Sequence, residues 1–162
     1  MNKYKNFSVT IYGDLKKYND VLSMARCRIF YKGKNRNSSF ITEDFAEKLI
    51  ATIPYTPVKG IYNAEEGDFE GHGNTTDGRI YGIVPSEQEV DFAWEDHLDE
   101  DGVTRTYACV NVLLFTGLYE EAYEIVGKAQ SMELYPPSIK GHFEIIEGLK
   151  TYMFEDACFL GL

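Results

Sequence analysis

The stretch Val103-Thr104-Arg105-Thr106-Tyr107-Ala108-Cys109-Val110-Asn111-Val112-Leu113-Leu114-Phe115 is the longest strand-like segment of the chain. Its β-branched and aromatic side chains pack well on the pleated surface of a sheet. The most apolar run of the chain, residues 110–118, is interrupted by Asn111, Thr116 and Gly117. A helix that spans a bilayer needs about 20 consecutive apolar residues. The segment therefore predicts a strand of a folded domain and not a membrane span.

Shorter strand-like segments lie on both sides of this one. They are rich in Val, Ile, Tyr and Phe and are separated by turn residues such as Gly, Pro and Asn. We expect strands over residues 7–12, 24–32, 58–62 and 79–84, at Ser131, and over residues 143–146, 151–154 and 157–162. Residues 95–102 are expected to form an acidic turn before the long strand, and Gly141 and Gly148 to mark turns near the end.

Two helices are expected among these strands. Thr42 is typical of an N-cap, and Glu43 and Asp44 follow it near the positive end of the helix dipole. The buried stripe of this helix is predicted to be Phe45, Ala46, Leu49, Ile50 and Ile53. A second, short helix is expected over residues 120–128, with Tyr123 and Val126 inward.

These elements predict one α+β domain over residues 1–162. We expect a mostly antiparallel, partly closed β-barrel core flanked by a few helices. A chain of 162 residues with 44% apolar and 14% aromatic residues is long and apolar enough for a real core. The last residues, 154–162, read as a buried strand without a polar tail, so we expect a domain that lacks a C-terminal extension.

Charge and cysteine content narrow the class of protein. The net charge of −10 argues against a surface that neutralises nucleic-acid phosphates. Cys27, Cys109 and Cys158 have no CxxC spacing, so we expect free thiols in a reducing cell. Cys109 and Cys158 lie within apolar strand-like segments, so we expect these two thiols to be buried. The N-terminus lacks the apolar region of a signal peptide, which favours a cytosolic location.

Three residues have the order and setting of a serine protease site. His72 lies in Asp68-Phe69-Glu70-Gly71-His72-Gly73, and Ser131 lies in Gln130-Ser131-Met132-Glu133-Leu134. A serine hydroxyl needs a nearby base, and that base needs a partner that fixes its tautomer. Histidine suits the first role because its pKa lies near the working pH. Asp156 is the candidate for the second role.

The third member of this site has alternatives. Glu155 is the neighbour of Asp156 and would point to the opposite strand face. His142 is another candidate, although a surface role suits it better. His97 is expected in the solvated acidic turn, without a catalytic role. Taken one at a time, the loop histidine, the strand-start serine and the acidic pair are ordinary surface residues.

Metal sites are weaker readings of the same chain. Asp68, Glu70 and His72 alternate and could bind a divalent ion, but no further His or Cys ligand lies nearby in the sequence. Residues 97–108 approach an EF-hand loop but have His97 and Ala108 where the end ligands belong. We expect no metal and no cofactor; P-loop, GxGxxG and GxSxG motifs are absent from the sequence.

Five short stretches resemble the prohead proteases of tailed phages, a group related to the herpesvirus assemblins. Residues 55–62 and 68–73 are similar to the apolar strand and the catalytic His of that family, and residues 78–84 to the strand after it. Residues 130–134 resemble the nucleophile strand, and residues 155–162 the closing strand. The resemblance covers the chain from about residue 25 to its end.

The resemblance implies a β-barrel core, a Ser–His dyad and a variable third member. Carried over, His72 is the base, Ser131 the nucleophile and Asp156 the third member. Some relatives place the acid before the His, which keeps Asp44 and Asp14 open. No Arg suits the oxyanion role that assemblins use, and the helical scaffold extension of the family is missing.

The implied function is maturation of a phage head. The substrates would be the internal scaffold, extensions of the major capsid protein and the protease itself, inside the prohead in the cytoplasm of an infected bacterium. Self-association is expected, and neither nucleic acid nor membrane is an expected partner. The rival functions are an inactive scaffold or capsid-assembly protein of the same fold, and a metal-dependent hydrolase that uses Asp68, Glu70 and His72.

Overall fold

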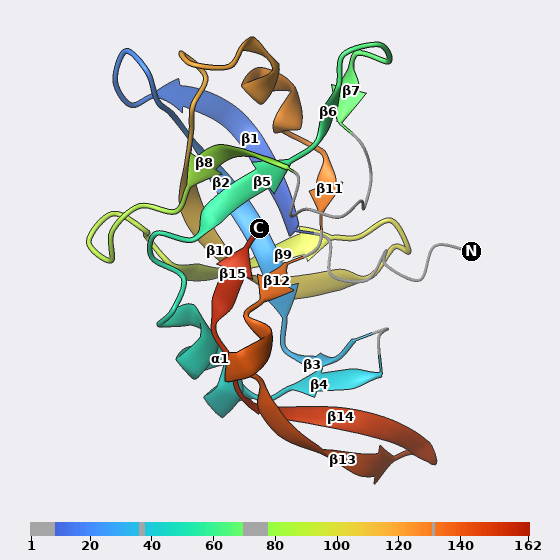
Figure 1. Ribbon diagram of the computed structural model, residues 1–162. Helices are drawn as coiled ribbons and strands as arrows, with labels where there is room; N and C mark the ends of the chain where they lie inside the picture. The colour runs from blue at the N-terminus through green and yellow to red at the C-terminus, as the bar shows by residue number, and fades with distance from the viewer. Residues whose placement is uncertain (1–8, 36–37, 70–77, 131) are drawn as a thin grey trace.

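The structure is a computed structural model that describes residues 9–35, 38–69, 78–130 and 132–162 (Figure 1). Most of these residues lie in antiparallel strands, with one α-helix and short 3₁₀ helices among the described residues. The expected α+β class with mostly antiparallel pairing is therefore confirmed. No helix within the described ranges is long and apolar enough to cross a membrane.

The largest sheet is built around β10, the long strand with which the sequence analysis began. Its order is β11-β1-β2-β10-β8-β5, and β9 also pairs with β10. The first four of these strands are β11 (Ala129–Gln130), β1 (Val9–Lys17), β2 (Ser23–Tyr31) and β10 (Thr104–Leu114). The others are β8 (Arg79–Ile83), β5 (Pro57–Gly60) and β9 (Ala93–Leu98).

Two strands share one edge of β10. Residues 104–109 of β10 pair with β9, and Leu113 and Leu114 pair with Ile83 and Gly82 of β8. The opposite edge pairs with β2 from Tyr107 to Leu114, with a bulge after Ala108. A strand paired on both edges has its backbone groups satisfied, so it can lie in the middle of the core.

The C-terminal strand joins this sheet at β5. β15 (Phe159–Gly161) pairs with β12 (Glu133–Leu134), and the backbone of Leu162 bonds to both Pro57 and Lys59 at 3.0 and 2.8 Å. The ladders between the described residues nevertheless stay open, with β11 and β5 as the ends of the large sheet. The strands of the described residues therefore form no closed barrel, whereas the sequence analysis predicted a partly closed one.

A second sheet lies at the other end of the molecule, beside α1 (Figure 1). Its order is β13-β14-β4-β3, and only β14 and β4 run parallel in it. The strands are β13 (Lys140–Ile146), β14 (Leu149–Asp156), β4 (Ser39–Ile41) and β3 (Gly33–Lys34). Glu147 and Gly148 both have positive φ at the β13–β14 turn, as a tight hairpin requires. Gly141, expected at a turn, lies instead within β13.

The helix α1 (Glu43–Ile50) follows the sequence prediction closely. The Thr42 side chain accepts a hydrogen bond from the Phe45 amide at 3.1 Å, which confirms the N-cap. Phe45, Ala46 and Leu49 are buried, and the ring of Phe45 stacks on Phe154 with centroids 5.1 Å apart. This contact fixes the helix against β14.

Two local predictions were wrong. Residues 95–102 are not all turn, because Ala93–Leu98 form β9 and only the residues after them turn back toward β10. The second helix is a 3₁₀ helix, η2 (Glu120–Ile125), which buries Ala122 and Ile125, while Tyr123 is exposed. A 3₁₀ helix has three residues per turn, so residues three apart share its inner face.

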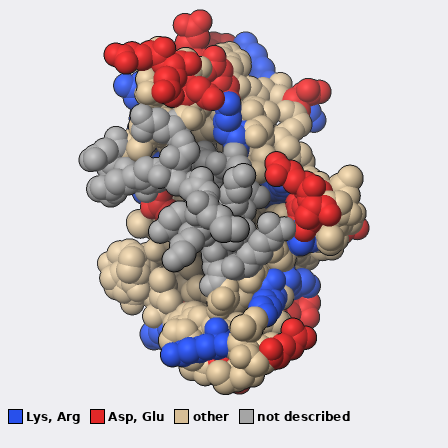
Figure 2. Space-filling model, turned by 90° about the vertical axis from the view of Figure 1, so that its right-hand side faces the viewer, with Lys and Arg blue, Asp and Glu red and all other residues tan. Residues whose placement is uncertain are grey.

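The charges visible in Figure 2 are unevenly spread. Acidic side chains gather at the end that carries η2 and the hairpin of β6 (Tyr62–Asn63) and β7 (Asp68–Phe69), where Glu65, Glu66 and Glu120 are exposed. Lys and Arg side chains are interspersed with acidic ones elsewhere on the visible described surface. The described residues on this face therefore form no continuous basic surface.

Replacement of Gly82 by Ala should destabilise the domain by about 1–3 kcal/mol, because overpacking of a fitted site costs that much. A Cβ at position 82 would overlap the carbonyl oxygen of Leu113, whereas one at Gly161 would meet only the flexible end of Lys59. Urea unfolding of Gly82→Ala and of the control Gly161→Ala measures the difference. Equal midpoints for the two variants would contradict the prediction.

Candidate functional site

The two central residues of the predicted protease site, His72 and Ser131, lie outside the described residues. Asp156 is described and is the last residue of β14. It pairs with Lys140, and its Oδ1 accepts a hydrogen bond from the amide of Ala157 at 3.0 Å. The dyad thus stays a prediction, and the structure bears on it through its neighbours in the chain.

Two ion pairs join those neighbours. Asp68, four residues before His72, lies with its Oδ1 2.7 Å from the Nζ of Lys128, three residues before Ser131. Lys59 lies with its Nζ 3.4 Å from Oε2 of Glu133, two residues after Ser131. The two chain segments that flank the predicted base and nucleophile are therefore in contact.

Lys59 also connects the strand after residues 70–77 to Glu133. It pairs with Ile80 of β8, the strand that follows that segment. Ile80, which follows the segment that contains His72, thus pairs with Lys59, and the Lys59 side chain contacts Glu133 of β12, two residues after Ser131.

Asp156 is at the other end of the β12–β15 pairing. Glu133 is level with Gly161, and the Tyr135 amide donates to the Cys158 carbonyl at 2.9 Å. Asp156 lies five residues before Gly161, roughly 16 Å along an extended chain. The ladder therefore does not bring Asp156 to the described neighbours of Ser131.

The other candidates for the third member of the protease site are either paired with another side chain or exposed to solvent. His142 Nδ1 lies 2.5 Å from Oε1 of Glu155, and both side chains are about half exposed on the β13–β14 hairpin. The hydrogen bond between the His142 ring and the Glu155 carboxylate, which accepts it, raises the pKa of His142. Asp14 and Asp44 are exposed residues of β1 and α1.

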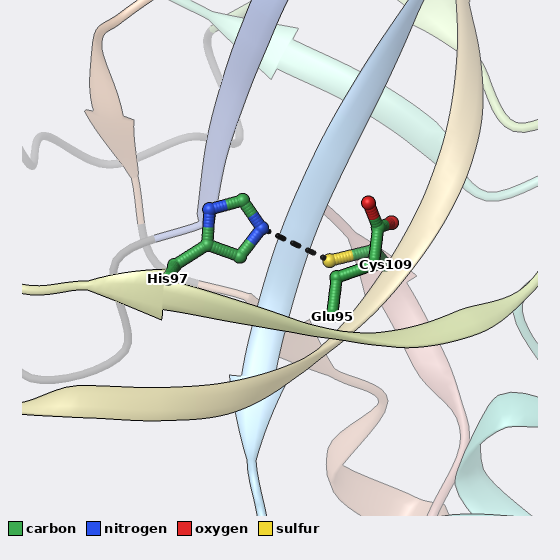
Figure 3. Close-up of side chains that lie close together, drawn as sticks. All are labelled: Glu95, His97 and Cys109. Carbon is green, nitrogen blue, oxygen red and sulfur yellow. Dashed lines mark hydrogen bonds between the residues drawn. The ribbon is translucent and has the colours of Figure 1, made fainter.

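A cluster that the sequence analysis did not predict lies on the large sheet (Figure 3). Glu95 and His97 of β9 and Cys109 of β10 point to the same face, and Cys109 Sγ lies 3.6 Å from His97 Nε2. One ligand atom of each residue lies within 4.8 Å of the other two. We call these three residues the Glu95–His97–Cys109 cluster.

Glu95 is held by two neighbouring strands. Its Oε2 accepts hydrogen bonds from Tyr12 Oη at 3.1 Å and from Arg26 Nε and Nη2 at 3.2 and 2.5 Å. Burial alone would raise the pKa of Glu95, but the hydrogen bond and charge of Arg26 lower it. Glu95 is therefore an ionised carboxylate at neutral pH.

The other two members are neutral at that pH. Burial and the charge of Arg28 lower the pKa of His97, whose ring packs edge-on against Tyr12 with centroids 4.6 Å apart. Burial raises the pKa of Cys109 to about 11. A cysteine nucleophile needs a lowered pKa, so this pair is not arranged for thiolate catalysis.

A second polar group lies beside the cluster and explains the acidic residues before β10. Asp99 accepts from Arg105 at 2.6 Å and from the Tyr107 hydroxyl at 2.8 and 2.9 Å, and Arg28 lies 3.4 Å away. Asp101 binds Arg105 through both carboxylate oxygens. Asp99 and Asp101, two of the carboxylates of the EF-hand-like stretch, are thus both in ion pairs with Arg105.

The sequence contained a signal for the cluster. Glu95 and His97 are two residues apart, which places them on one face of a strand. The acidic run that follows led to the prediction of a solvated turn, and His97 was set aside with it. Cys109 is buried as expected, and Cys27 is buried as well. Cys158, which was also expected to be buried, is only partly buried and lies between β14 and β15.

The fold and these contacts define a mostly antiparallel α+β domain with a polar cluster on its largest sheet. A family model described as the YonD N-terminal domain matches residues 20–162, most of the chain. The chain belongs to this family. No curated protein and no solved structure matched it.

The three thiols should differ in reactivity under native conditions. At pH 8 we expect an alkylating reagent to modify Cys158 roughly tenfold or more faster than Cys27 and Cys109, because burial keeps these two protonated. The rate at Cys109 should rise as the pH approaches 11. Peptide mass spectrometry measures each site, with Cys158→Ser as the control that removes the fast phase. A fast reaction at Cys109 at pH 8 would contradict the burial argument.

Proposed function

We propose that the chain is a serine endopeptidase that matures the phage prohead, with Ser131 as nucleophile and His72 as base. The observation that supports this proposal is the ion pair Asp68–Lys128, which joins a residue four before His72 to a residue three before Ser131. The ion pair Lys59–Glu133 adds that β5 contacts the residues after Ser131. Asp68 and Lys128 are 60 residues apart in the chain, so the fold and not proximity along the chain brings them together. The order of the two residues is the one that prohead proteases share.

The family match supports the phage part of the proposal. The YonD N-terminal domain match suggests a phage-like protein family. The proteolytic part depends on the residue order and the two ion pairs. The finer fold, a barrel-like core similar to that of assemblins, is supported by Leu162, which links β15 to β5 and so brings β12 next to the end of the large sheet.

The chemistry would follow the serine protease pattern. His72 takes the proton from Ser131, the Ser131 oxygen attacks the scissile carbonyl, and water hydrolyses the acyl-enzyme. The substrates would be the internal scaffold, extensions of the major capsid protein and the protease itself. The site of action would be the prohead, in the cytoplasm of the infected bacterium, where the high local concentration favours self-association.

Substitution of either dyad residue should abolish maturation. Ser131→Ala and His72→Ala should each lower the cleavage rate by roughly 10⁴-fold or more, as removal of a serine protease nucleophile or base does. The measurement is intact mass of the capsid and scaffold proteins after co-expression with each variant. Ser86→Ala is the matched serine control, and we expect this variant to cleave normally.

The outcomes separate the proposal from its rivals. Uncut substrates with the wild-type protein, together with no labelling by a fluorophosphonate, would favour an inactive scaffold or capsid-assembly protein. Cleavage that survives both substitutions would assign it to other residues. The metal-dependent rival predicts loss of activity with a chelator; the ion pair of Asp68 with Lys128, which lowers the pKa of that carboxyl, already occupies one of its ligands.

The third member is tested separately, because the β12–β15 register separates Asp156 from the flanks of Ser131. A carboxylate that orients the catalytic imidazole is worth about 10⁴-fold in kcat. Asp156→Asn and its neighbour control Glu155→Gln are compared in the same cleavage assay. A loss of that size in Asp156→Asn alone identifies the orienting acid, and a rate within tenfold of wild type removes Asp156 from the site.

A further inference from the structure

We propose that the Glu95–His97–Cys109 cluster binds a single transition-metal cation of the Zn²⁺ class. The site is distinct from the proposed protease residues and does not depend on the proposed function. It is formed by two adjacent strands, β9 and β10, whose pairing fixes the positions of all three side chains. Its support comes from the ligand geometry, from the contacts that orient Glu95 and from the chemistry of the three ligands.

The separation of the sulfur and the imidazole nitrogen fits a tetrahedral cation. Typical Zn–S and Zn–N bonds of about 2.3 and 2.0–2.1 Å at a tetrahedral angle place the two ligand atoms about 3.6 Å apart. Cys109 Sγ and His97 Nε2 are separated by 3.6 Å. Thus the two ligands that are softest already have the spacing that a bound cation requires, and only the Glu95 side chain needs to move closer.

Glu95 is oriented as a supported metal ligand. The hydrogen bonds that Tyr12 and Arg26 donate to its carboxylate all go to Oε2. Oε1 is therefore the oxygen that can turn toward the cation while Oε2 keeps its partners. Metal-binding carboxylates and imidazoles in proteins are commonly held by such outer contacts, which orient them and tune their affinity.

The protonation states define the binding step. A cysteine binds a metal ion as the thiolate and a histidine binds it as the neutral imidazole, so the Cys109 thiol must lose its proton. On binding, the Sγ–H bond breaks, a sulfur–metal bond forms and one proton passes to the solvent. The thiolate and the Glu95 carboxylate then face the cation, and the carboxylate is shared with Arg26.

The ligand types select the class of cation. A thiolate and an imidazole favour Zn²⁺ or Co²⁺, whereas Ca²⁺ and Mg²⁺ prefer oxygen ligands throughout. Three protein ligands leave a fourth position for water or a small ligand. Arg26 and Arg28 lie nearby but are paired with Glu95 and Asp99, so their charge is partly neutralised.

Cobalt titration of the metal-free full chain tests the proposal. A thiolate bound to Co²⁺ produces a near-ultraviolet charge-transfer band, and a tetrahedral site produces intense visible bands. We expect both at one equivalent of Co²⁺, displacement by Zn²⁺, and release of about one proton per ion at pH 7. Cys109→Ser should abolish the charge-transfer band, and His97→Gln should weaken Co²⁺ binding at least about 100-fold.

Controls distinguish this site from surface binding. Cys158→Ser retains the cluster and should leave the spectrum unchanged, and so should His142→Gln, which removes the exposed histidine near Glu144 and Glu155. Circular dichroism checks that each variant is folded, and proton release by the wild-type chain needs no variant at all. Absence of a charge-transfer band, or a band that survives Cys109→Ser and disappears in Cys158→Ser, would overturn the proposal.

Discussion

The backbone pairing of β10 on both edges is the constraint on which the rest of the domain depends. β2 occupies one edge, and β9 and β8 divide the other. Because its ladder is complete, β10 can lie in the middle of the core and bury Ala108, Val110 and Val112 on one face. Its alternate residues, among them Cys109 and Asn111, then lie on the opposite face.

Ion pairs and hydrogen bonds connect the side chains on that opposite face. Arg26 donates to both Glu95 and Asn111. Asp99 accepts from Arg105 and the Tyr107 hydroxyl and forms an ion pair with Arg28. Such partly buried ion pairs contribute little to the free energy of folding, since the cost of desolvating the charges offsets much of their attraction. They do specify the alignment of β9, because a slip by one residue would turn Glu95 and His97 to the other face. The same register that completes the sheet thus holds His97 against Cys109.

The elements that were predictable are those with strong local patterns. β2 and β10 have long apolar patterns and form within a residue or two of the expected limits. α1 begins after its N-cap Thr42 as expected but ends at Ile50, three residues before Ile53. β9 was missed because its charges resemble a solvated turn, and its partners lie on β1 and β2, far away in the sequence. The Glu95–His97–Cys109 cluster was missed for the same reason. Asp156 was chosen from its strand-like setting, which contains no information about the register of β15 against β12.

The sequence by itself determined the class of the fold, the cap of α1, the burial of Cys109 and the acidic character of the surface. These follow from side-chain volume, polarity and short-range periodicity, which act over a few residues. Only the tertiary structure decided which distant segments meet: Asp68 with Lys128, Lys59 with Glu133, and His97 with Cys109. Those contacts depend on strand order and register. The whole sheet sets both through backbone hydrogen bonds, which depend little on the type of side chain.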